Sequence, residues 1–69
     1  MLTDYRIQFA SDIHADTFVG EIYYKEKMIA DLIRVEDAIK ICLFGDTPID
    51  DPLDLNEFLE IVNRVREEL

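Results

Sequence analysis

The sequence predicts an α+β protein in which a four-stranded antiparallel meander packs on one C-terminal helix (ββββα), as a single domain over residues 1–69. Three observations lead to this prediction. Apolar and polar residues alternate near the N-terminus, β-branched and aromatic residues dominate the middle of the chain, and a capped segment with helical periodicity closes it. Apolar residues make up 49% of the chain, with two glycines and two prolines, which favours a packed core over disorder.

The first two strands are predicted in the N-terminal third of the chain. Residues 5–9 alternate between apolar and polar side chains, which is the pattern of a half-buried strand. A polar loop is expected over 11–17, and the β-branched and aromatic run 18–24 indicates the second strand. Three charged residues, 25–27, then predict the turn of a hairpin.

The segment 28–44 fits two interpretations. Its first apolar residues also lie on one face of a helix, but a helix would carry two acidic residues onto that same face. The later alternation and the high β-branched content favour two strands, 28–34 and 39–44, joined by residues 35–38. The choice between strand and helix for 28–34 stays open at this point.

The last segment predicts a helix with a well-defined start. Asp54 is a natural N-cap, Glu57 lies three residues later as in a capping box, and Leu53 and Phe58 occupy the positions of a hydrophobic staple. An apolar stripe follows, which must pack on the sheet. The residues of this stripe are Leu55, Phe58, Leu59, Val62, Val65 and Leu69.

Composition excludes several classes of protein. Cys42 is the only cysteine, so the chain holds no internal disulfide and no multi-cysteine zinc site, and its apolar neighbours predict that it is a small buried residue. No window approaches the roughly 20 apolar residues of a membrane helix, and the N-terminus lacks the apolar region of a signal peptide. We therefore expect a cytoplasmic protein with no membrane partner.

The net charge is the most informative feature for function. The chain carries 16 acidic against 7 basic residues, a formal charge of −9, which would repel phosphate and argues against direct nucleic-acid binding. Between Lys40 and Arg64 six acids occur and no base. This charge either keeps the protein soluble or steers a basic protein partner. The residues predicted to bind such a partner are Asp46, Asp50, Asp51 and Asp54.

Two tyrosines complete the predicted binding surface. Tyr23 and Tyr24 are consecutive in a predicted strand, so their side chains should point to opposite faces of the sheet. One should lie in the core and the other should be partly exposed. The exposed tyrosine is a candidate interface anchor, because tyrosine is enriched at binding hot spots.

Two short motifs resemble calcineurin-like metallophosphoesterases. Residues 6–14 resemble the strand that delivers Asp-x-His in that family, and Gly45-Asp46 resembles its second motif. The resemblance implies that Asp12, His14 and Asp46 are ligands of a dinuclear metal centre. His14 is the only histidine, so the later histidine motifs of the family have no counterpart, and three ligands do not hold two metal ions. We expect no enzyme, no catalytic or metal site and no cofactor.

The whole-chain plan resembles small acidic bacterial immunity proteins. The segments that carry this resemblance are 18–24, 28–32 and the closing helix 53–69, together with size and charge. Those proteins are encoded beside contact-dependent or polymorphic toxins and neutralise them by binding. The resemblance implies an immunity protein or antitoxin that occludes the basic cleft of a nuclease-like toxin. The alternatives are a phage inhibitor that mimics nucleic acid, a degenerate phosphoesterase fragment, and a module that forms a homodimer through an edge strand.

Overall fold

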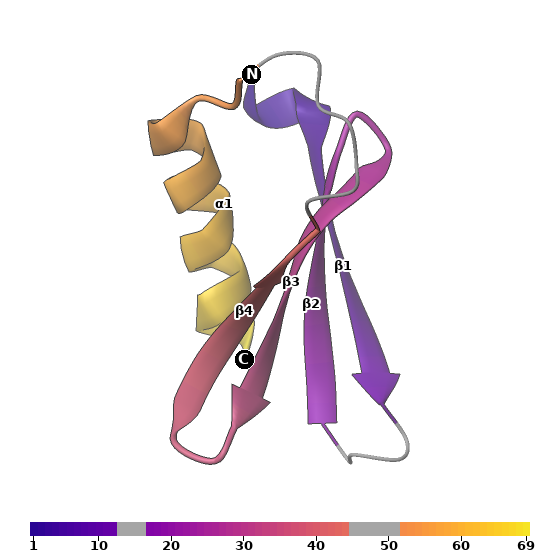
Figure 1. The fold of residues 1–69 in the computed structure, drawn as a ribbon, viewed down its shortest axis with the longest axis vertical. Helices are drawn as coiled ribbons and strands as arrows, with labels where there is room; N and C mark the ends of the chain where they lie inside the picture. Colours follow the sequence, from indigo (N-terminus) through magenta and orange to yellow (C-terminus); the bar gives the residue numbers. More distant parts are fainter. Residues whose placement is uncertain (13–16, 45–51) are drawn as a thin grey trace.

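Four antiparallel strands form one sheet in the order β1-β2-β3-β4, and one helix lies along one face of it (Figure 1). The computed structural model describes residues 1–12, 17–44 and 52–69. It confirms the predicted ββββα arrangement and the extended interpretation of residues 28–34. The elements are a short 3₁₀ helix (Leu2–Asp4), β1 (Tyr5–Asp12), β2 (Thr17–Tyr24), β3 (Lys27–Val35), β4 (Ala38–Leu43) and α1 (Leu55–Glu68).

The two described hairpin turns are tighter than the sequence predicts. Lys25 and Glu26 both have positive φ, 50° and 67°, and Glu36 has a φ of 57°. Positive φ at both central residues suits a two-residue turn, because its twist matches that of the strands it joins. β2 and β3 are therefore linked by only two residues, and β3 and β4 by the two residues after Val35. The strands β1 and β2 likewise extend into the predicted loop.

The core lies between α1 and the facing side of the sheet. α1 approaches β2 closely at Gly20, since a Cβ built on this residue would overlap Cγ1 of Val65 in α1. Arg34 on β3 also reaches the helix, where its Nε donates a hydrogen bond of 2.8 Å to the carbonyl oxygen of Leu69. The buried apolar residues are Tyr5, Ile22, Ile29, Ala30, Leu32, Ile61 and Val65.

The buried face of α1 differs from the predicted stripe. Ile61, which the stripe omits, is buried together with Val65, whereas Leu55 and Leu59 are 68% and 47% exposed. The buried face is centred on Ile61 and Val65, with Phe58 partly buried beside them. Leu55 and Leu59 lie on one flank of that face and are not covered.

The predicted helix start is confirmed. Asp54 is the N-cap, and its Oδ1 accepts a hydrogen bond of 2.9 Å from the backbone nitrogen of Glu57. Leu53 and Phe58, the predicted staple positions, both pack partly buried against the core.

The prediction for Cys42 is wrong, because this residue is exposed. β4 lies at the edge of the sheet, and Cys42 is opposite Asp31 on the side that faces away from α1. Apolar neighbours in sequence point to the other face of a strand, so they do not bury it.

Candidate functional site

The face of the sheet that points away from α1 is the candidate functional surface, and we call it the open face. No helix or strand in the described parts of the chain lies over it. Its members follow from the strand registers and from the alternation of side chains along each strand. They include Arg6, Gln8, Val19, Glu21, Tyr23, Met28, Asp31, Ile33, Lys40 and Cys42.

Two carboxylates lie side by side at the centre of the open face. Glu21 on β2 is directly opposite Asp31 on β3, and both side chains are half-buried. Side chains directly opposite on antiparallel strands have Cβ atoms about 4.5–5.5 Å apart. Neither carboxylate forms an ion pair with another described residue. We call Glu21 and Asp31 the acid pair.

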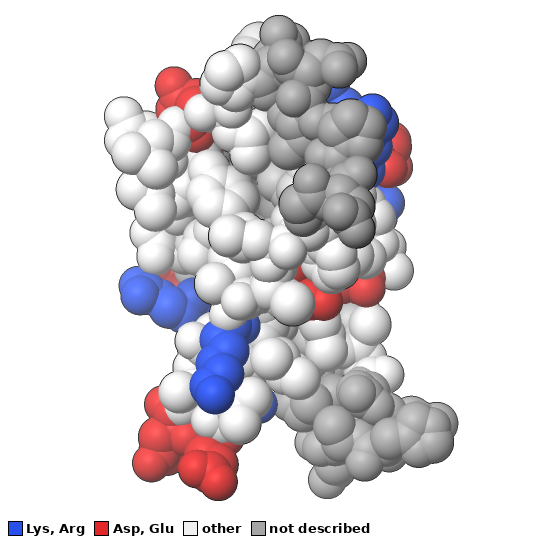
Figure 2. All heavy atoms as spheres, viewed as in Figure 1, with Lys and Arg blue, Asp and Glu red and all other residues white. Residues whose placement is uncertain are grey.

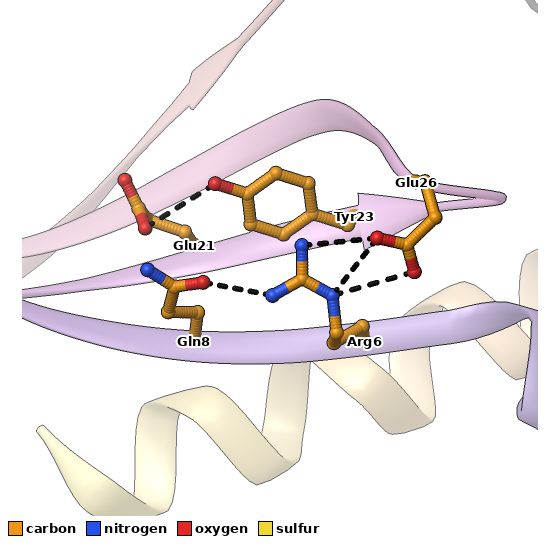
Figure 3. Close-up of polar contacts among 5 residues, drawn as sticks. All are labelled: Arg6, Gln8, Glu21, Tyr23 and Glu26. Atoms are coloured by element: carbon orange, nitrogen blue, oxygen red, sulfur yellow. Dashed lines mark hydrogen bonds and ion pairs between the residues drawn. The ribbon is translucent and has the colours of Figure 1, made fainter.

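The nearest arginine is already engaged elsewhere (Figure 3). Arg6 Nη2 lies 3.2 Å from Oε2 of Glu26, and Arg6 Nη1 donates a 2.7 Å hydrogen bond to Gln8. The guanidinium also stacks on Tyr23, with its Cζ 4.1 Å from the ring centroid. The Tyr23 hydroxyl in turn donates to Oε1 of Glu21 over 3.5 Å, a long hydrogen bond. Arg6 therefore orders Tyr23 and forms no ion pair with Glu21 or Asp31, and no other described residue supplies a cation to the acid pair.

The two predicted tyrosines point to opposite faces, as expected. Tyr23 is half-buried on the open face. Tyr24 packs against the core, with its ring centroid 5.0 Å from that of Tyr5. Burial raises the pKa of Tyr5, whose hydroxyl has no hydrogen-bond partner among the described residues. Tyr23 and Tyr24 do not contribute to one surface, and Tyr23 is the one that the open face presents.

The predicted acidic residues are only partly described. Asp54 is exposed, but its carboxylate caps α1. Asp46, Asp50 and Asp51 lie outside the described residues. The acid pair was not predicted as a binding site.

The residues of the metallophosphoesterase resemblance are not brought together by anything the structure describes. His14 and Asp46 lie outside the described residues, and Asp12 ends β1 with a side chain that is not described. Within residues 1–12, 17–44 and 52–69, no group of three or more His, Cys, Asp or Glu side chains could hold a metal ion. In the same ranges no helix has the length and apolar character needed to cross a membrane.

The chain matches no known protein-family model, no curated protein and no solved structure. The open face is therefore the feature of the molecule that bears on function.

Like charges directly opposite in a sheet destabilise it by up to about 1 kcal/mol. Asp31→Asn should therefore raise the free energy of unfolding. The thermal midpoint should rise by a few degrees, because about 1 kcal/mol corresponds to roughly 4–8 °C in a domain of this size. Thermal melts at low and high salt measure the effect, which salt should reduce. Asp37→Asn in the exposed β3–β4 turn is the matched control and should leave the midpoint nearly unchanged. A lower midpoint for Asp31→Asn would contradict repulsion within the acid pair.

Proposed function

We propose that this protein is a non-enzymatic binding protein that captures a basic surface of another protein on the open face of its sheet. In the cell it would act as an immunity protein or antitoxin that occludes the basic cleft of a nuclease-like toxin. The observation that carries the proposal is the acid pair, Glu21 and Asp31, half-buried at the centre of an uncovered face with no cation from the described residues.

The surroundings of the acid pair suit a protein interface. Val19, Tyr23, Met28 and Ile33 are half-buried apolar or aromatic side chains on the same face. Strong binding contacts are surrounded by such side chains, which exclude water around a few central residues, and tyrosine is enriched among those residues. Tyr23 is held in place by Arg6, so little side-chain freedom would be lost on binding.

Charge explains both recognition and inhibition. A lysine or arginine of the partner would form ion pairs with Glu21 and Asp31. Its positive charge would relieve the repulsion between these two carboxylates. Lysine and arginine are the residues with which nucleases and other nucleic-acid binders contact phosphate, so a toxin occupied in this way could not bind its substrate. The net charge of −9 would accelerate the encounter with a basic partner.

The acids at 46–54 contribute to this long-range attraction in the proposal. Asp54 is committed to capping α1, so we assign it a role in steering and not in direct contact. Asp46, Asp50 and Asp51 remain predicted contributors to the same field.

The experiment uses the protein encoded by the neighbouring gene as the binding probe. We expect a basic toxin whose growth inhibition this protein relieves on co-expression. Combining Glu21→Gln with Asp31→Asn should weaken the complex at least tenfold, which is about 1.4 kcal/mol of binding free energy. Calorimetric titration measures the affinity.

The matched control for this experiment combines Asp37→Asn with Glu67→Gln, which removes the same charge from exposed positions away from the acid pair. Its affinity should change little. Equal losses in both double variants would show that only net charge matters, and a neighbouring protein that neither binds nor is inhibited would refute the proposed function.

A further inference from the structure

The outer edge of β4 presents a row of backbone hydrogen-bonding groups that no other strand of the described residues uses. The backbone nitrogen of Phe44 donates to the carbonyl oxygen of Ile29 over 3.0 Å, so this residue faces β3. Backbone groups alternate in direction along an antiparallel strand, so Ile39, Ile41 and Leu43 point their N–H and C=O groups away from the sheet. β4 is the last strand in the sheet order, and no described strand pairs with these groups.

Exposed apolar side chains border this edge. Ile41 and Leu43 are 46% and 67% exposed on the side of β4 that faces α1. Glu57 of α1 contacts the Met1 ammonium over 3.1 Å, which turns that flank of the helix toward β1. Leu55 and Leu59 lie on the opposite flank, toward β4. In Figure 2 uncharged atoms cover most of the described surface between α1 and β4.

We propose that a second copy of this chain pairs with β4, antiparallel to it, and continues the sheet across a two-fold axis beside Ile41. Ile41 then lies opposite Ile41 of the partner subunit, and Ile39 lies opposite Leu43 of the partner subunit. This register uses the outward N–H and C=O groups of all three residues. The axis is perpendicular to the sheet, so both helices lie on one side and their Leu55 and Leu59 side chains flank the apolar strip.

Charge favours a second copy over a basic partner at this edge. β4 is the one described strand without an acidic residue, and its single charge is Lys40. A basic protein would find no carboxylate there, whereas two copies of a chain with charge −9 can meet at this strand with little repulsion. In the proposed register Lys40 lies opposite Cys42 of the partner subunit, one strand away from Asp31 of the partner subunit.

The edge of β4 carries few of the features that prevent an edge strand from pairing with another strand. Apart from Lys40, the edge lacks the prolines and bulges that keep edge strands from pairing.

Cysteine cross-linking tests the proposal and its register. Lys40→Cys places a new thiol opposite Cys42 of the partner subunit, so mild oxidation should give a covalent dimer on a non-reducing gel. The wild-type chain should not cross-link through Cys42, because Cys42 and Cys42 of the partner subunit would be diagonal neighbours about 7–8 Å apart. That separation exceeds the span of a disulfide. Gln8→Cys, on the open face of β1, is the control: it keeps the β4 contact, but oxidation should give no covalent dimer on a non-reducing gel.

Sedimentation of the wild type keeps the test independent of cross-linking chemistry. The wild-type protein should sediment with twice the chain mass of 8.1 kDa. Leu43→Glu should sediment as a monomer, because it puts an acidic residue on each side of the contact. A wild-type monomer at all concentrations would overturn the dimer. Cross-linking by wild-type Cys42, or by Gln8→Cys but not Lys40→Cys, would overturn the register. The dimer leaves both open faces exposed, so these outcomes are separate from those of the toxin experiment.

Discussion

Gly20→Ala is expected to destabilise the protein by about 1–3 kcal/mol, which is typical of overpacking and is a large part of the roughly 3–5 kcal/mol that one small core supplies. The reason is the close approach of α1 to β2. A Cβ on Gly20 would overlap Cγ1 of Val65 and lie 3.3 Å from Cε1 of Phe9. Val65 is fully buried and β-branched, so its side chain has little freedom to move aside. The midpoint of urea denaturation measures the loss.

Val65→Ala tests whether overlap with Val65 causes the destabilisation by Gly20→Ala. Alone it leaves a cavity and should also destabilise the protein. Combined with Gly20→Ala it removes the overlapping methyl group, so the double variant should be more stable than the sum of the two losses predicts. In an ordinary strand, glycine is less stable than alanine by about 0.5–1 kcal/mol. Stabilisation by Gly20→Ala would therefore show that the helix does not press on β2 at this point.

Ile22→Ala is expected to have the other large effect. Ile22 is fully buried on β2 beneath the helix, and removing its side chain should cost about 2–5 kcal/mol, enough to populate the unfolded state at room temperature. Far-ultraviolet circular dichroism during urea denaturation measures it. Ile22→Val keeps most of the contacts and should cost about 0.5–1.5 kcal/mol. Equal midpoints for Ile22→Ala and the wild type would place the core elsewhere.

The fold class could be predicted because its signals are local. Alternation along the strands and the Asp54 cap depend on neighbouring residues only, and both are found in the structure. The ends of the strands could not be predicted as well. Lys25 and Glu26 form a two-residue turn with positive φ without glycine, which the sequence does not indicate.

Exposure was harder to predict than secondary structure. Cys42 lies between two apolar residues and is exposed, because side chains alternate along β4 and its own side faces away from α1. Ile61 follows the charged residue Glu60 and is buried, because its burial depends on which face of α1 meets the sheet. The same placement leaves Leu55 and Leu59 uncovered.

The acid pair could not be predicted, because it depends on an irregularity in register. Continuing regular pairing from the turn would put Glu21 opposite Ala30. A shift between Ile22 and Tyr23 instead brings Glu21 opposite Asp31. Such a bulge moves every later side chain by one position, and it leaves no clear signal in the sequence.

Titration of the labelled protein with an oligoarginine peptide, followed by amide NMR, measures whether the acid pair on the open face binds a cation. We predict that the amide signals of Glu21, Asp31 and Tyr23 move first and saturate together, and that Asp31→Asn removes this response. Movement confined to the signals of the exposed acids Glu67 and Glu68, with those of Glu21 and Asp31 unchanged, would show that the acid pair does not bind the cation.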